Sequence, residues 1–236
     1  MESNNPALRR NAFSFAGEET GSMTLSGAIN KSGILFLIMM AGAYVGWNLE
    51  NMMLGLIGAL AAFGISFFLI RSPQRAPTIA PIYAALDGLF IGTISVFAEA
   101  RLPGIAANAM TLTFGILGVM LACYRMGILR ATPQFTRVVV FATIGIAIVY
   151  LANFVMSLFG AQMAMINQAS PVGIAFSLII AGVASLNLIL DFDLFERQTA
   201  AGAPKYMEWY CGFALLVTIV WIYVEMLRLL SKLNRR

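Results

Sequence analysis

The chain has 236 residues, of which 60% are hydrophobic and 11% are charged, whereas an ordinary soluble domain carries about 25% charged residues. This composition excludes a typical soluble protein and indicates a membrane protein. The net charge of +4 is small, and the chain has no histidine, which excludes histidine-based catalytic triads, histidine metal sites and the usual proton switch near neutral pH.

The chain begins with a polar segment, residues 1–31, in which the charged residues are scattered. A secretory signal peptide instead places a basic segment before a short apolar core, so we predict a polar cytoplasmic segment here. We expect residues 32–230 to form a transmembrane domain and residues 231–236 to form a basic tail.

Seven apolar stretches follow the polar segment, each close to the ~20 residues that cross a ~30 Å hydrocarbon core as a helix. They cover residues 32–49, 51–71, 78–98, 106–129, 136–160, 171–192 and 207–230. No charged residue lies between Arg137 and Asp191. As one helix this segment would be about 80 Å long, much longer than the thickness of a bilayer, so the chain must turn back between Gly160 and Pro171. We therefore predict an all-α bundle of seven transmembrane helices.

The last stretch has two interpretations. Lys205 and Glu208 make its start amphipathic, and Glu225 and Arg228 interrupt its end. It either crosses the membrane or forms a surface or re-entrant helix, which would leave six spans.

The distribution of basic residues predicts the orientation, because cytoplasmic loops carry an excess of lysine and arginine. A cytoplasmic N-terminus would place these residues on the inner side: Arg9, Arg10, Lys31, Arg71, Arg75, Arg125, Arg130, Arg137, Arg197 and Lys205. The outer loops would then hold only Arg101, although a seventh span would also place the basic C-terminal tail outside. We predict a cytoplasmic N-terminus.

Asp87 lies inside the third stretch. An ionisable side chain in the hydrocarbon core costs about 2.5–3.5 kcal/mol on insertion scales, so it needs a structural or functional reason. Tyr83 lies one turn before Asp87 on the same face, and Gly88 and Gly92 form a small-residue pair that lets another helix approach. A functional carboxylate and a structural one, bonded to a neighbouring helix, fit this pattern equally well.

Asp191 and Asp193 end the sixth stretch. Asp191 shares a polar helix face with Ala184 and Asn187, and such a face should lie against protein rather than lipid. The alternative is that both aspartates mark the boundary with water. We favour that alternative for Asp193, because Glu196 follows it closely, and a buried role for Asp191.

Glu225 lies in the last stretch on the same face as Thr218 and Trp221. Arg228 follows it by three residues, so an ion pair within one helix explains it without a further function. An ion or proton site is the alternative.

No phosphate-binding glycine loop, nucleophile elbow or metal-ligand motif appears in the sequence. We therefore expect no enzymatic activity and no cofactor, and the small positive charge gives no reason to expect a nucleic-acid partner. The expected partner is the lipid bilayer.

Several stretches spread over nearly the whole chain match one known family: residues 3–7, 23–31, 80–92, 190–193, 206–210 and 227–230. With its seven spans and the acidic end of the sixth, the chain resembles the Bax inhibitor-1 superfamily, and more closely its bacterial YccA-like membrane proteins. The resemblance implies a bundle wrapped around a central seventh helix, a location in the bacterial inner membrane and a pH-sensitive calcium leak.

The resemblance also implies a site. In characterised members, one carboxylate from the sixth helix and one from the seventh are latched by an arginine at the inner end of the second helix. Asp191 matches the first of these positions and Arg71 matches the latch. The seventh-helix position is open, because one alignment of the last stretch makes Glu225 the partner and the other places Val217 or Thr218 there.

We therefore expect a protein that passes or senses a cation such as Ca²⁺. The candidate ion- and proton-binding residues are Asp87, Asp191, Asp193 and Glu225. If Asp191 meets a second carboxylate, the two repel and one holds its proton to a higher pH, and protonation would then release Arg71.

A rival hypothesis is a non-conducting regulator that binds another membrane protein, such as a membrane protease. Small-residue faces would then be docking surfaces. The candidate faces are Gly55/Gly58, Gly88/Gly92 and Ala181/Ser185. A membrane enzyme is a third interpretation, which would need a catalytic cluster that spacing does not reveal.

Overall fold

The computed structural model describes residues 21–161, 163, 166 and 168–234. Within these ranges, seven α-helices are long and apolar enough to cross a membrane. They are α1 (Leu25–Leu49), α2 (Met52–Arg71), α3 (Ala76–Glu99), α4 (Ile105–Arg125), α5 (Pro133–Leu158), α7 (Pro171–Ala200) and α8 (Met207–Leu233), and a short 3-10 helix, η2 (Pro73–Arg75), precedes α3. The predicted all-α architecture with seven spans is confirmed.

Several helix boundaries differ from the predicted ones. The first helix begins at Leu25 because the Thr24 hydroxyl caps it by accepting from the Gly27 amide at 3.0 Å, a common way to satisfy the first turn. The fourth ends at Arg125 shortly before Gly127, which has a φ of 70°. The sixth spanning helix, α7, continues to Ala200 and therefore contains both aspartates near its end.

The predicted terminal segments are only partly described. Residues 1–20 of the polar segment and 235–236 of the basic tail lie outside the described residues. The rest of both segments belongs mainly to helices, because α1 begins at Leu25 and α8 ends at Leu233.

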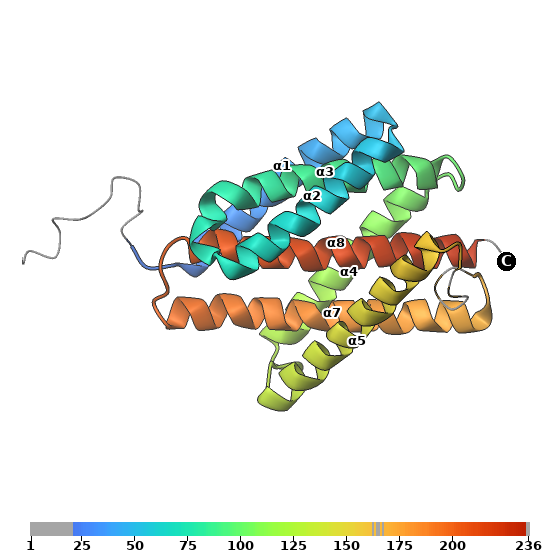
Figure 1. Cartoon of the computed structure of the whole chain (residues 1–236). Coiled ribbons are helices and arrows are strands. Elements are labelled where there is room, and N and C mark those ends of the chain that lie inside the picture. The colour runs from blue at the N-terminus through green and yellow to red at the C-terminus, as the bar shows by residue number, and fades with distance from the viewer. Residues whose placement is uncertain (1–20, 162, 164–165, 167, 235–236) are drawn as a thin grey trace, which may run out of the picture.

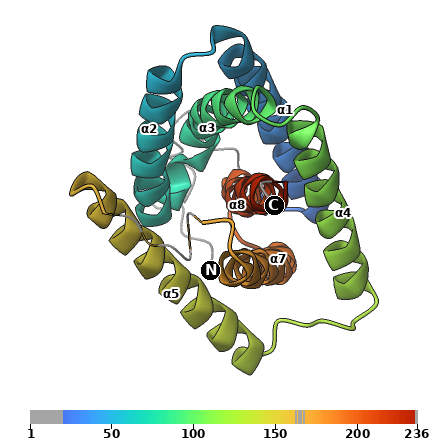
Figure 2. The same ribbon diagram turned by 90° about the vertical axis from the view of Figure 1, so that its right-hand side faces the viewer.

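The last helix, α8, is the centre of the bundle. It contacts α1, α3, α4 and α7, and Figure 2 shows it surrounded by the other helices. In its most apolar stretch 56% of the residues are buried, against 6% in α5. The central position of the seventh helix is therefore confirmed, and the interpretation of α8 as a surface helix is wrong.

Successive helices run in opposite directions between the two ends of the bundle. α1 begins at the end that we call proximal, and α8 ends at the opposite, distal end (Figure 1). α2, α4 and α7 run toward the proximal end, whereas α3 and α8 start from it. α5 lies obliquely across the outside of the bundle (Figures 1 and 2).

α1 and α3 pack with their backbones in close contact. A Cβ atom added at Gly88 would lie 2.1 Å from the Met39 carbonyl oxygen, and one added at Gly92 would lie 1.9 Å from that of Ala43. The predicted small-residue face of α3 is thus occupied by α1 of the same chain. Gly55 and Gly58 of α2 lie in the same way against α3.

We expect Gly92→Ala to destabilise the protein by about 1–3 kcal/mol, the usual cost of overpacking, because the backbone that it meets cannot move aside. Gly115→Ala in α4 is the matched control, since an added Cβ there meets nothing within 4 Å. Thermal unfolding of both purified variants in detergent tests this. Equal unfolding temperatures would contradict the close contact.

Candidate functional site: carboxylates inside the helical bundle

Asp87 is bonded within its own helix. Its side chain is buried, and its Oδ2 accepts a hydrogen bond from the Tyr83 hydroxyl at 3.2 Å. Tyr83 in turn packs edge-on against Phe213 of α8, with 4.8 Å between ring centroids. The carboxylate therefore lies beside the central helix, and the tyrosine that shares its helix face is its hydrogen-bond partner.

Asp191 lies against α8. Its carboxyl group interacts with the Thr218 hydroxyl, and its Oδ2 is buried without a hydrogen-bond partner among the described residues. Of the alignments that the sequence left open, the structure thus places Thr218, and not Glu225, opposite Asp191.

The register of α7 and α8 explains this placement. The Lys232 ammonium donates to the Ser177 hydroxyl at 2.8 Å, and both Ser177 to Asp191 and Thr218 to Lys232 span fourteen residues. The two antiparallel helices therefore keep one register over this length. Glu225 lies two turns, about 10 Å by helical rise, beyond Thr218, so Asp191 and Glu225 do not form a carboxylate pair.

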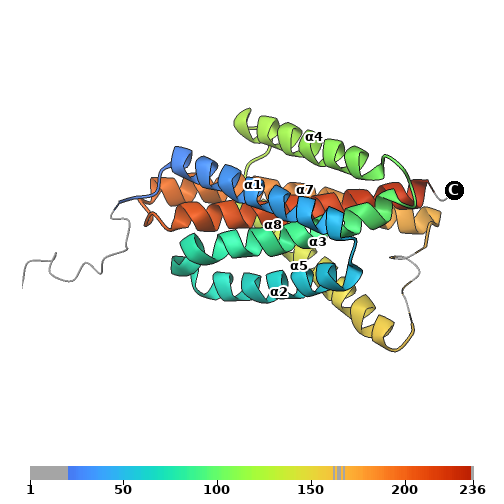
Figure 3. The ribbon, with the colours of Figure 1, turned by 90° about the horizontal axis from the view of Figure 1, so that it is seen from above.

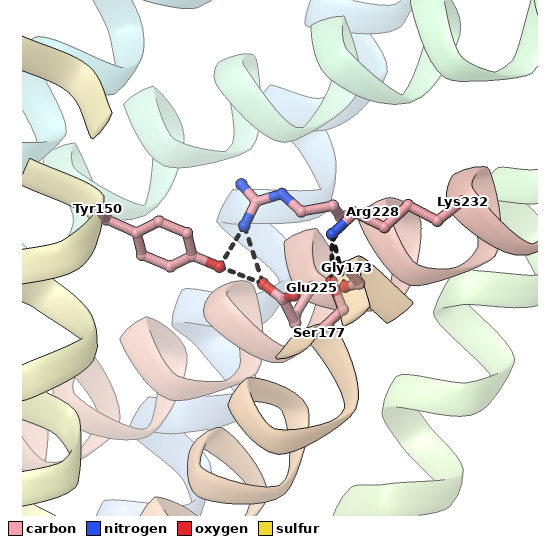
Figure 4. Close-up of polar contacts among 6 residues, drawn as sticks. All are labelled: Tyr150, Gly173, Ser177, Glu225, Arg228 and Lys232. Atoms are coloured by element: carbon pink, nitrogen blue, oxygen red, sulfur yellow. Dashed lines mark hydrogen bonds and ion pairs between the residues drawn. The ribbon is translucent and has the colours of Figure 1, made fainter. Parts of the chain in front are cut away.

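Glu225 instead belongs to a polar cluster near the distal end, shown in Figure 4. It is completely buried, and its Oε2 accepts hydrogen bonds from the Tyr150 hydroxyl at 2.7 Å and from Arg228 Nη1 at 3.0 Å. Arg228 also donates to the Tyr150 hydroxyl and lies 4.8 Å from the centre of its ring. The ion pair that the spacing predicts is present, while Glu225 Oε1 is buried without a partner among the described residues.

Lys232 extends the polar face of α8 beyond Glu225. It is buried, and its ammonium group donates to the Gly173 carbonyl at 2.9 Å as well as to Ser177 (Figure 4). The sequence analysis assigned Lys232 to the basic tail and gave Tyr150 no role. Lys232 follows Glu225 by seven residues, which places both on one helix face, and this spacing could have indicated that Lys232 is buried. Nothing in the sequence points to Tyr150.

Asp193 forms an ion pair with Arg197 one turn later. The Arg197 side chain is 64% exposed, whereas the Asp193 side chain is 19% exposed and its Oδ2 atom is buried. The exposed arginine fits the boundary interpretation of Asp193, although the carboxylate itself is mostly buried. By contrast, Asn187 faces protein as its polar stripe predicts, since its amide donates to the Thr143 hydroxyl of α5 at 2.9 Å.

Arg71 does not reach Asp191 in this structure. It is exposed at the proximal end of α2, which packs against α3, and its side chain makes no hydrogen bond or ion pair with any described residue. A latch between Arg71 and Asp191 is therefore not formed here, although both lie toward the same end of the bundle.

The carboxylates act separately. Among the described residues, no group of three or more acidic or cysteine side chains could hold a metal ion. Asp191 combines an unpartnered carboxylate oxygen with a neighbouring hydroxyl, that of Thr218.

Comparison with known protein families gives a match. A family model described as "Bax inhibitor 1 like" matches residues 5–235, nearly the whole chain. The matched range contains all seven spanning helices and all the carboxylates described above. Among curated proteins, none matches the chain.

We expect Tyr150→Phe to destabilise the protein by about 1 kcal/mol, the usual contribution of a hydrogen bond, because Glu225 loses a partner and α5 loses a link to α8. Tyr44→Phe is the control, since the Tyr44 side chain is 72% exposed. Thermal unfolding in detergent measures the difference. If both variants unfold at the same temperature, the hydroxyl of Tyr150 does not stabilise the bundle.

Proposed function

Because the chain belongs to the Bax inhibitor 1 like family, we propose that this seven-helix membrane protein is a pH-sensitive leak or sensor for Ca²⁺ or a similar cation, and not an enzyme. One observation carries the proposal: Asp191 has a buried carboxylate oxygen without a hydrogen-bond partner, between α7 and the central helix. Placing an ionisable side chain at membrane depth costs free energy, so such a residue is usually paired with another group or has a function.

The chemistry of the proposed site rests on two oxygen donors. Ca²⁺ binds anionic carboxylate oxygens together with neutral oxygen ligands, and the Thr218 hydroxyl supplies a neutral oxygen next to Asp191. A proton and a cation compete for the same carboxylate. Lower pH therefore removes the negative charge that attracts the cation, so pH sensitivity needs only one acid.

Glu225 has a different role in the proposal. Arg228 neutralises its charge and Tyr150 binds the same oxygen, so Glu225 attracts a cation less than Asp191 does. We assign it to the link between α5 and α8 at the distal end.

We further propose that the protein lies in the bacterial inner membrane with its proximal end in the cytoplasm. The positive-inside rule supports this orientation. The described basic residues near the proximal end are Lys31, Arg71, Arg75, Arg125, Arg130, Arg137, Arg197 and Lys205, and those near the distal end are Arg101, Arg228 and Lys232.

The rival hypothesis of a non-conducting regulator loses part of its support. The Gly88/Gly92 face is covered by α1 and the Gly55/Gly58 face lies against α3, so neither is free for another membrane protein. Flux measurements separate the two hypotheses directly.

We expect purified protein in liposomes to release Ca²⁺ more slowly as the pH falls, and Asp191→Asn to lower the flux and remove its pH dependence, because asparagine resembles the protonated acid at every pH. Asp193→Asn is the control, since Asp193 is paired with Arg197 at the boundary, and it should keep the wild-type profile. Fluorescent Ca²⁺ indicators inside the liposomes report the rates. A flux that responds neither to pH nor to Asp191→Asn would exclude this mechanism.

Thr218→Asp tests the single-acid site by adding a carboxylate, whereas Asp191→Asn removes one. It places a second carboxylate against Asp191, and two interacting acids titrate in two steps. The flux profile of this variant should therefore extend over a wider pH range than that of the wild type, whereas Thr218→Asn should not widen it. Identical profiles for the aspartate and asparagine variants would show that position 218 does not meet the site.

A further inference from the structure

Two adjoining hollows open at the proximal end of the bundle, between α4 and its neighbours. The first has a volume of about 500 Å³ and is lined by charged and polar groups, including Arg125, Arg130, Asp193 and Glu196. The second has a volume of about 230 Å³ and is mainly apolar. Tyr124, Arg125 and Glu196 line both, so the polar hollow continues into the apolar one.

The apolar hollow is a groove between α1 and α4. Ile29 of α1 and Leu121 of α4 line its sides, and Phe192 and Phe195 of α7 line its base. Figure 3 shows α4 at the edge of the bundle beside α1. The groove therefore lies next to the lipid.

The depth of the groove corresponds to one lipid leaflet. Leu117 of α4 lines the groove. About one turn further into the bundle, Phe36 of α1 packs edge-on against Phe114 of α4, with 5.6 Å between ring centroids. From Arg125 to Phe114 the helix rises about 16 Å. This is close to half of a ~30 Å hydrocarbon core.

The unmatched charge at the mouth of the groove is positive. The side chains of Arg125 and Arg130 make no hydrogen bond or ion pair with any described residue. Asp193 is paired with Arg197, and Glu196 accepts a hydrogen bond from the neutral Tyr124 hydroxyl at 2.7 Å and so keeps its negative charge. The three arginines and two acids leave one net positive charge at the mouth, which an anionic group would balance.

We propose that this surface binds an anionic phospholipid of the proximal leaflet. Its phosphate group lies at Arg125 and Arg130, and one acyl chain lies in the groove between α1 and α4. A lipid satisfies both hollows at once, because it joins a negative charge to an apolar chain of one leaflet's length. Asp191 lines neither hollow, although its neighbours Phe192 and Asp193 do, and the proposal does not depend on cation flux.

Native mass spectrometry of the full chain in detergent, titrated with phosphatidylglycerol or phosphatidylethanolamine, tests the charge of the site. We expect tighter binding of phosphatidylglycerol. Arg125→Gln with Arg130→Gln should weaken it about 30-fold, since each basic residue near an anionic lipid contributes about 1 kcal/mol and 1.4 kcal/mol is a factor of ten. Arg101→Gln at the distal end is the control and should leave the binding unchanged. Equal affinity of the wild type for both lipids would overturn the proposal.

A second arm tests the groove. Leu121→Trp fills it, whereas Leu112→Trp adds the same bulk to α4 at an exposed position that does not line it. Only the first variant should lose phosphatidylglycerol binding. If inorganic phosphate displaces the lipid at equal concentration, or if Leu121→Trp binds it as the wild type does, the acyl chain does not occupy the groove and the proposal fails. Both outcomes can be read independently of Ca²⁺ flux.

Discussion

The antiparallel register of α7 and α8 determines which polar groups meet inside the bundle. Ser177 and Asp191 on α7 face Lys232 and Thr218 on α8, and the equal separation within each pair keeps both contacts on one seam. A repeat of seven residues keeps the same faces of two packed helices in contact. The same repeat carries Glu225 away from Asp191, so the acids lie at different depths and meet different partners.

The central position of α8 explains why it can carry so many buried charged residues. Glu208, Glu225 and Lys232 are all buried, and each is bonded to a neighbouring helix or to its end. Glu208 accepts hydrogen bonds from the Thr24 amide at 3.0 Å and its hydroxyl at 3.1 Å, where the start of α1 has amides to satisfy and favours negative charge. The surrounding helices exclude lipid from these groups, whose exposure to hydrocarbon would be costly.

The sequence predicted the number of helices and most of their limits, because the length of an apolar run reports directly on the bilayer that it crosses. It predicted the pair of Arg228 with Glu225, and it placed Tyr83 on the same helix face as Asp87, to which Tyr83 is hydrogen-bonded. The alternative of a structural Asp87 bonded to a neighbouring helix is not what the structure shows, because this bond lies within α3. Partners on other helices depend on register and tilt. For this reason the sequence did not indicate the contact of Tyr150 with Glu225, and it did not determine which residue of α8 lies opposite Asp191.

The central helix is synthesised after the other spanning helices that the structure describes. Ribosomes make the chain from its N-terminus, so α1 to α7 enter the membrane before the helix that α1, α3, α4 and α7 all contact exists. The close pair of α1 and α3 can form early, because it needs no later segment. The bond between Glu208 and Thr24 joins the beginning of the first helix to the beginning of the last, so the interior of the protein closes only after translation has passed α8.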